Sequence, residues 1–161
     1  MKFVAWTGAA IALLAVLLLV VGQLGLLAGT VPKRLGVTDG RLKPPSSTPN
    51  SVSSQTSLYP EHAQFSYAAM QPLAIQGDGA VTMRKIAALL QGMPRTSLIR
   101  DEPEYLYAQC STPVLKFTDD VEFWLDTPAG LIHFRSASRL GRKDFGVNRA
   151  RIETILAQLS G

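Results

Sequence analysis

The sequence has a single cysteine and only two histidines, and this scarcity excludes two kinds of site. Cys110 has no second cysteine to pair with, so no disulfide can form within the chain, and a lone thiol is most often a small core residue. His62 and His133, together with one cysteine, give no metal-ligand spacing. We therefore expect neither a metal nor a cofactor.

Catalytic and nucleotide-binding motifs are missing as well. The chain contains no G-x-S-x-G element for a serine nucleophile, no phosphate-binding loop and no dinucleotide-binding glycine pattern. Neither histidine has a serine partner at a defined spacing, so each is predicted to be a surface or sheet residue. No internal repeat is present, and a length of 161 residues predicts one domain.

Positive charge is modest and unevenly spread. The net charge of +4 is low for a protein dedicated to binding nucleic acid. Six basic side chains fall within residues 134–151, FRSASRLGRKDFGVNRAR. This run lacks the interleaved aromatic residues of proteins that bind single strands, and it contains no recognition-helix pattern. We expect no nucleic-acid partner.

Charge is absent from one long segment near the N-terminus. The run from Phe3 to Ala28 carries no charged residue, and as a helix rising about 1.5 Å per residue it exceeds the hydrocarbon core of a bilayer, about 30 Å. A cleaved signal peptide is the alternative, but its apolar part is usually only about 7–15 residues long and ends at small residues. Leu27-Ala28-Gly29 is a poor cleavage signal. Residues 1–30 are thus predicted to be an uncleaved transmembrane anchor, which contacts the lipid bilayer through residues 3–28.

Charges beside the anchor bear on its orientation. Lys2 precedes the apolar run, and four basic residues follow it: Lys33, Arg34, Arg41 and Lys43. This bias, taken alone, favours the cytoplasmic side for the C-terminal part. The margin is small and the segment before the anchor is very short, so the charges leave the side open.

Residues 31–60 are rich in proline, serine, threonine and glycine. Little of this segment can bury apolar area, so we expect a tether. Asp39-Gly40 and Pro49-Asn50 suit tight turns, and part of the tether is therefore expected to pack on the domain. The soluble domain is predicted to span residues 61–161, which is long enough for one modest core.

Two amphipathic helices are predicted to bracket this domain. Apolar residues at helical spacing begin at Met83, with Thr82 as the expected N-cap and Gly92 and Pro94 at the end. The same spacing recurs near the C-terminus at Ile152, Ile155, Leu156 and Leu159. Asp144 or Asn148 could cap this second helix.

The intervening residues alternate with a period of two and predict two hairpins. SLIR and YLYAQCS flank DEPE, and VEFWLD and LIHFRSAS flank TPAG. The four-residue TPAG loop sets Leu125 opposite Ile132, Phe123 opposite Phe134, and Glu122 opposite Arg135. The phenylalanines then share the core face, while Glu122, Trp124, His133 and Arg135 share the other face. The prediction is a two-layer α+β fold of about four antiparallel strands, with the helices on the Phe123/Phe134 face.

Ten residues around the second hairpin could carry chemistry. They are Asp119, Asp120, Glu122, Arg135, Ser136, Ser138, Arg139, Asp144, Asn148 and Arg149. The three neighbouring carboxylates could do general acid/base work if their environments separated their pKa values. Cross-strand ion pairing is the structural alternative, and arginine opposite glutamate at a sheet position favours it.

An anion site at the same corner is a second possibility. Ser136 and Ser138 are small and leave room beside Arg135 and Arg139, whose guanidinium groups suit a carboxylate or phosphate. A helix starting near Asp144 or Asn148 would open its free N–H groups onto this corner. Arg149, in the first turn of that helix, opposes the helix dipole unless an acid or a bound anion holds it. A buried ion-pair network is the alternative here as well.

Five sequence blocks resemble a known family. LGVTDGRL, TPNSVSSQ, FTDDVEF, RSASRLG and DFGVNR occur in this order in a family of bacterial and plastid proteins catalogued as domain of unknown function 1499. The resemblance covers roughly residues 35–160. Members are often anchored in a membrane or exported as lipoproteins, and the family has no established activity. The resemblance therefore implies a location in the cell envelope and implies no reaction.

Two departures from the family pattern separate its residues from those peculiar to this chain. Where members often carry a cysteine pair around the S-P-N turn, this sequence has Pro45 and Ser51. Where the pattern tends to tyrosine and serine after RSASRxG, this sequence has Arg142 and Lys143. These two charges are outside the shared pattern, to which Arg135, Arg139 and Arg149 belong.

The sequence thus predicts a single-pass protein of the inner membrane whose soluble domain is a binding or structural module of the cell envelope. The exported members of the family favour the periplasmic side over the charge bias. The partner could be an anionic ligand or another envelope protein. The alternative is a small enzyme that acts on an anionic substrate through Asp119, Asp120 and Glu122 with Arg135 and Arg139.

Overall fold

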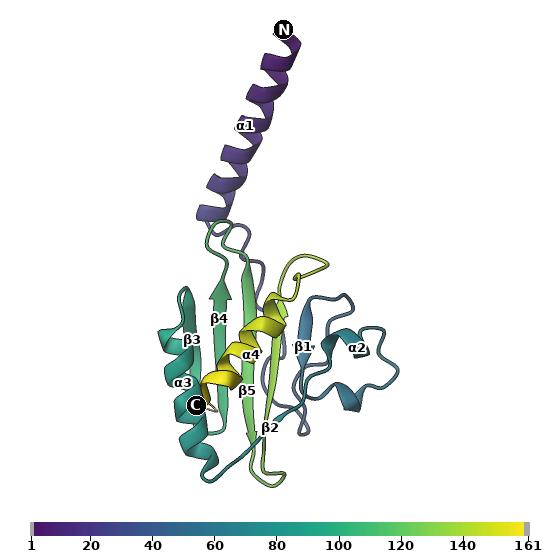
Figure 1. Cartoon of the computed structure of the whole chain (residues 1–161), viewed down its shortest axis with the longest axis vertical. Coiled ribbons are helices and arrows are strands. Elements are labelled where there is room, and N and C mark those ends of the chain that lie inside the picture. Colours follow the sequence, from purple (N-terminus) through teal and green to yellow (C-terminus); the bar gives the residue numbers. More distant parts are fainter. Residues whose placement is uncertain (1, 160–161) are drawn as a thin grey trace.

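The structure, a computed structural model, describes residues 2–159, with side chains from Trp6 onward. Residues 1 and 160–161, which belong to the predicted anchor and domain ranges, lie outside the described residues. In chain order the elements are α1 (Lys2–Gln23), β1 (Ser51–Ser53), η1 (Thr56–Leu58), α2 (Phe65–Ala68), β2 (Leu73–Ala74), α3 (Gly79–Gly92), β3 (Thr96–Glu102), β4 (Tyr105–Ser111), β5 (Thr118–Asp126), β6 (Leu131–Ser138) and α4 (Val147–Leu159). α1 projects away from the other elements, which form an α+β domain (Figure 1).

An open antiparallel sheet is the centre of this domain. Its strands run in the order β1-β6-β5-β4-β3, and β2 pairs with the same edge of β6 as β1 does. The predicted α+β class and its two hairpins are confirmed. The sheet has two more strands than the expected four, and both are short strands that precede the first predicted helix.

The register of the second hairpin is the one that its loop length predicts. Phe123 lies opposite Phe134 and Glu122 opposite Arg135, and the two phenylalanine rings are 6.0 Å apart between centroids. Trp124 stacks on His133 on the other face of the same strands, with 5.4 Å between ring centroids. Neighbouring residues on a strand point to opposite faces, so this register fixes what each face carries.

The helices α3 and α4 cover the apolar face of the sheet (Figure 1). Phe123 and Phe134 are fully buried there against side chains of both helices, such as Ile86 and Ile152. The observed cap of α3 lies four residues before the predicted one: the Asp78 carboxylate accepts from the N–H groups of Ala80 and Val81. The prediction of Thr82 as the cap is wrong because the helix continues past its apolar repeat toward the N-terminus, where only the capping group marks its start.

The carboxylate of Asp144, one of the two predicted capping residues, caps the start of α4. Its Oδ1 accepts from the N–H of Gly146 at 3.1 Å and its Oδ2 from the N–H of Asn148 at 3.1 Å. Phe145 and Gly146 lie between cap and helix, and both have positive φ angles, +54° and +84°. Asn148 is inside the helix, and its side chain is free to reach the sheet.

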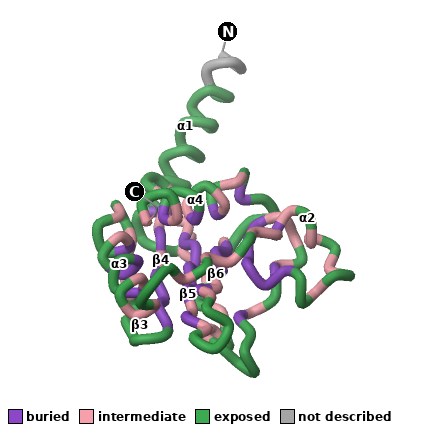
Figure 2. The backbone as a smooth tube through the Cα atoms, turned by 60° about the horizontal axis from the view of Figure 1, so that its bottom comes forward, coloured by how far each residue is buried: buried purple, intermediate pink, exposed green. Residues whose placement is uncertain are grey.

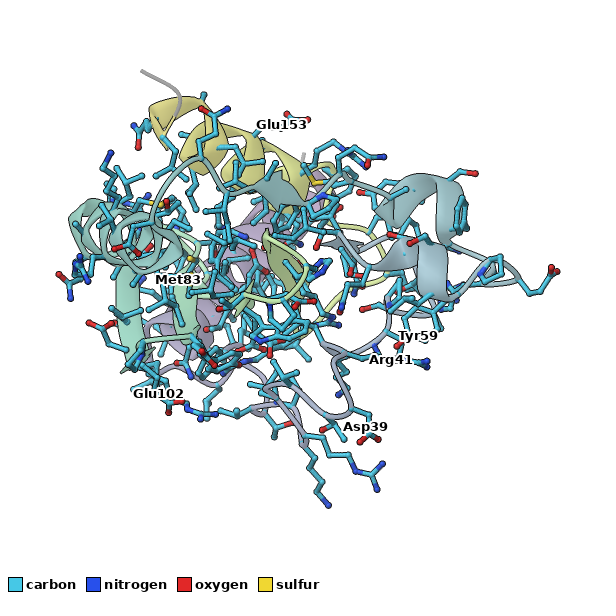
Figure 3. All side chains as sticks on the ribbon, turned by 90° about the horizontal axis from the view of Figure 1, so that it is seen from below. Asp39, Arg41, Tyr59, Met83, Glu102 and Glu153 are labelled. Carbon is cyan, nitrogen blue, oxygen red and sulfur yellow. The ribbon has the colours of Figure 1, made fainter. Side chains whose placement is uncertain are left out.

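The second face of the sheet is covered by a chain segment that precedes every strand. We call residues 35–46 the cover segment. Its turn at Asp39-Gly40 has the predicted tight geometry, with φ angles of +50° and +67° and reciprocal hydrogen bonds between Thr38 and Arg41. The side chains of Asp39 and Arg41 point outward (Figure 3), while Leu42 is buried against Tyr105 and Tyr107.

The segment that follows the cover is part of the sheet. Val52 of β1 is fully buried in the main core, and Ser51, Val52 and Ser53 pair with Ala137, Ser136 and Arg135 of β6. Residues 31–60, which the sequence predicts to be a tether partly packed on the domain, thus include β1 and the cover segment. Buried residues are concentrated on β4, β5 and β6 (Figure 2).

Candidate functional site

The ten candidate residues are divided between the two faces of the sheet. Asp120, Glu122, Arg135 and Arg139 lie under the cover segment, as the alternation along β5 and β6 requires. The other six, Asp119, Ser136, Ser138, Asp144, Asn148 and Arg149, lie on the side of α4. The single corner that the sequence suggests is therefore two separate networks, because Asp119 and Asp120 are neighbours in the chain but point in opposite directions.

Under the cover segment, Asp120 and Arg139 form a bidentate ion pair. The Arg139 Nε atom is 3.0 Å from Oδ2 and the Nη2 atom is 2.7 Å from Oδ1. Tyr107 donates its hydroxyl to the same Oδ1 at 2.6 Å and accepts from Arg139 at 3.1 Å. Burial, and then the hydrogen bond to Asp120, raise the pKa of Tyr107 to about 12. The hydrogen bond to Asp120 likewise raises the pKa of Arg139, so the guanidinium stays charged.

Glu122 and Arg135 form a looser pair beside it. Glu122 is fully buried, and its Oε1 accepts from the Tyr105 hydroxyl at 2.7 Å and from the N–H of Gly36 at 2.8 Å. Its Oε2 lies 3.9 Å from the Nη1 of Arg135, and neither of these two atoms has a hydrogen-bond partner among the described residues. Burial lowers the pKa of Arg135, and the charge of Glu122 opposes this shift. The guanidinium Nε donates to the Pro44 carbonyl at 3.3 Å, so the cover segment binds both members of the pair.

On the helix side, Asn148 is the centre of the second network. Its Oδ1 accepts from Ser136, and its Nδ2 donates to Ser138, Asp144 and the Asn50 carbonyl. Asp144 also accepts from the Tyr67 hydroxyl. Burial raises the pKa of Asp144, but the hydrogen bonds from Tyr67, Asn148 and two backbone N–H groups outweigh this effect and hold the pKa below its ordinary value.

Two arginines of α4 differ from expectation. Arg149, expected to face an acid, donates instead to the backbone carbonyls of Tyr67 and Ala69, at 2.7 and 3.1 Å. The partner of Asp119 is Arg151, at 2.6 Å, which the sequence reasoning did not select. The helical spacing carried a signal for it, because Arg151 lies three residues after Asn148 and therefore on the same face of α4.

Tyrosines on β4 were also missed. The register of β4 against β5 sets Tyr107 opposite Glu122 and Tyr105 opposite Trp124, so both rings must lie on the face of the carboxylates. The sequence provides the alternation but not this register, since the six-residue connection 112–117 permits more than one pairing.

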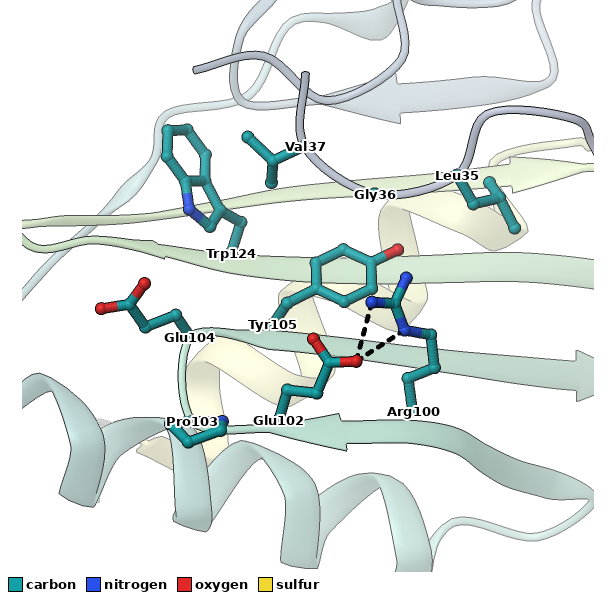
Figure 4. A pocket seen from close by; sticks show the side chains of 9 residues that line it. All are labelled: Leu35, Gly36, Val37, Arg100, Glu102, Pro103, Glu104, Tyr105 and Trp124. Atoms are coloured by element: carbon teal, nitrogen blue, oxygen red, sulfur yellow. Dashed lines mark hydrogen bonds and ion pairs between the residues drawn. The ribbon is translucent and has the colours of Figure 1, made fainter. Parts of the chain in front are cut away.

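A cavity of about 520 Å³ opens beside the first network, at the edge of the cover segment. Trp124 and Tyr105 form its apolar walls, and Arg100 lies 4.7 Å above the Tyr105 ring centroid while donating to Glu102 (Figure 4). The carboxylate of Glu104 borders the same space (Figure 4). None of the ten candidate residues lines this cavity, and within residues 2–159 no group of three or more histidine, cysteine, aspartate or glutamate residues is placed to hold a metal ion.

Comparison with known proteins gives a family and no activity. A family described as protein of unknown function (DUF1499) matches residues 41–159. No curated protein and no solved structure matches the chain. The match begins inside the cover segment and ends with α4, so it includes every strand of the sheet and both networks. The chain therefore belongs to the DUF1499 family of unknown function.

Proposed function

We propose that the protein is anchored in the inner membrane by α1, and that its domain is a structural or binding module on the periplasmic side of the cell envelope. One observation carries the proposal. The stretch Trp6–Gln23 is long and apolar enough to cross a bilayer, and only 6% of it is buried within the protein. Trp6 and Leu13 are 76% and 71% exposed, and the described part of the helix stands clear of the domain except at its C-terminal end (Figure 2). A helix with apolar side chains on all sides is stable when lipid surrounds it.

The second candidate function, an enzyme acting through the carboxylates, has less support. Asp119 and Asp120 are each bound by an arginine in a close ion pair, and Glu122 accepts two hydrogen bonds beneath the cover segment. A general acid or base must reach its substrate, and these side chains are at most 6% exposed. This pairing supports a structural role for both networks.

Membrane fractionation of cells that produce the full chain tests the anchor. We expect the protein to stay with the membranes after extraction with alkaline carbonate, and mass spectrometry of the purified chain to show residues 3–28 retained. Leu14→Arg together with Leu17→Arg should release it, because each arginine at mid-helix costs about 2.5–3.5 kcal/mol of insertion free energy. Val81→Arg, at an exposed position on α3, is the matched control. A mature chain that lacks the apolar segment would establish a signal peptide instead.

Reporter fusions after Gly161 test the side of the membrane. A periplasmic domain makes a fused alkaline phosphatase active and leaves a fused fluorescent protein dark. The reverse pair of results would place the domain in the cytoplasm, as the basic residues after the anchor favour when taken alone.

A further inference from the structure

Two loops of the domain lie against the end of α1 and the residues that follow it. The Gln23 side chain donates to the Val114 carbonyl at 2.8 Å, and a Cβ atom at Gly22 would come within 2.9 Å of the Leu115 backbone. A Cβ atom at Gly29 would meet the Arg139 side chain at the same distance. The loops 112–117 and 139–146 therefore form the end of the domain that faces the anchor (Figure 1). We call them the anchor-side loops.

The anchor-side loops expose large apolar side chains. Val114, Leu140 and Phe145 are 53%, 43% and 93% exposed, and Leu24 and Leu26, where the chain leaves α1, are also exposed. Single exposed apolar residues are ordinary on protein surfaces. These are different because they gather at the one end of the domain from which the apolar helix leaves.

Phe145 is the least expected of them. Its φ angle of +54° lies in the left-handed region, which is unfavourable for a side chain as large as phenylalanine. Glycine adopts this conformation without strain. The chain thus holds an aromatic ring in solvent on a strained backbone, and no contact within the described residues explains its presence.

Basic residues accompany these apolar side chains. Lys116, Arg142 and Lys143 lie on the anchor-side loops, and none of the three forms an ion pair with a carboxylate of the described residues. The only acid on the two loops is Asp144, which is buried and bound by Tyr67 and Asn148. The exposed charge at this end of the domain is positive.

We propose that the anchor-side loops dock on the surface of the bilayer that holds α1, with Phe145, Leu140 and Val114 at the level of the headgroups and the three cations on anionic phospholipid. The inference rests on the proposed anchoring by α1. Apolar side chains flanked by lysine and arginine are the composition that interfacial membrane contacts use, and each cation near an anionic surface adds to the attraction. Docking fixes the domain against the membrane and directs the Trp124 cavity, at the opposite end of β5, away from it.

The test uses the full chain reconstituted in vesicles of phosphatidylcholine with or without phosphatidylglycerol. A single cysteine at Val147→Cys, beside the loop, carries an environment-sensitive dye, and Pro128→Cys in the β5–β6 turn is the distant control; both are made with Cys110→Ala. We expect the dye at residue 147 to shift to the blue and to be quenched by brominated lipid in the anionic vesicles, and the dye at residue 128 to behave as in water.

Two variants separate the contributions. Phe145→Gly relieves the strained φ and should keep the melting temperature while the blue shift at residue 147 is lost. Arg142→Gln with Lys143→Gln should lose most of the shift in anionic vesicles and change little in neutral ones. Equal exposure of the dyes at residues 147 and 128 in a chain that floats with the vesicles would overturn the docking alone. A chain that fails to float with them would overturn the anchoring and the docking together.

Discussion

Arg139 and Arg142 lie three residues apart, yet their surroundings are opposite. The Arg139 side chain is 5% exposed and binds Asp120, itself 1% exposed, through two hydrogen bonds, whereas Arg142 is exposed on an anchor-side loop. Removing a buried partner leaves the other charge buried and unpaired, which is more destabilising than the net value of the pair.

Arg139→Met is therefore expected to lower the free energy of unfolding by about 3–5 kcal/mol. Arg142→Met, the matched control on the same loop, should change it by less than about 0.5 kcal/mol. Denaturant titration of the two variants in detergent measures the difference. If Arg139→Met were as stable as the parent protein, the arginine would not be structural and an anion site beside Asp120 would have to be reconsidered.

The Asp144 carboxylate makes the stability of the domain depend on pH. Its pKa is lowered in the folded protein by the hydrogen bonds that it accepts, so the unfolded state binds protons more readily. Its contribution is complete above the pKa of an unfolded aspartate, about 3.9, and is lost as the pH falls through the lower pKa of the folded state. We expect the free energy of unfolding to decrease over that acidic range.

Unfolding of Asp144→Asn measured between pH 7 and pH 3 checks this prediction. The variant should be less stable than the parent at pH 7, and the two curves should converge in acid. Asp101→Asn, at an exposed position on β3, should follow the curve of the parent protein. Parallel curves for Asp144→Asn and the parent would show that the carboxylate does not contribute this dependence.

The cover segment shows why hydrophobicity alone does not predict every segment that packs on a sheet. It covers the second face through the buried side chain of Leu42 and through hydrogen bonds to buried polar groups, namely Gly36 to Glu122 and Arg135 to Pro44. Composition tests whether a segment can bury apolar area, and this segment has little to bury. The loop length of TPAG, by contrast, was sufficient to predict the register of the second hairpin, because a one-residue shift would have turned Phe123 and Phe134 to the wrong face.

The side chain of Gln55, the residue before η1, forms hydrogen bonds to the backbone of the cover segment. It accepts from the N–H of Leu42 at 2.8 Å and donates to the Gly40 carbonyl at 2.9 Å. Gln55→Ala leaves these buried backbone groups without partners and should cost about 1–3 kcal/mol. Trypsin should also cleave sooner after Arg41, the basic residue of this stretch that is not followed by proline. Gln76→Ala, at an exposed position, is the control, and equal cleavage rates in both variants would show that Gln55 does not hold the segment.

At the scale of the whole molecule, the local patterns predicted the elements but not the contacts between distant segments. The anchor helix, both hairpins and the two long helices follow from composition and periodicity. Most of the ten candidate residues lie on or beside β5 and β6, but they belong to two networks, and their partners come from β4, α2, α4 and the residues before β1. The positions of Tyr105 and Tyr67 depend on how those elements pack, and one sequence carries no local signal for that packing. Helical spacing does place Arg151 on the face of α4 that carries Asn148.

The long connections between residues 35–50, which include the cover segment, and the rest of the domain have a consequence for synthesis. Gly36 binds Glu122, 86 residues later, and Asn50 binds Gly141 and Asn148, 91 and 98 residues later. At about 5–20 residues per second, a ribosome needs about 5–20 s to deliver these partners. During this interval the segment is in solvent beside a nascent sheet that is still incomplete. A long apolar segment would be prone to aggregate during this interval, whereas a polar segment stays soluble until β6 and α4 have been synthesised.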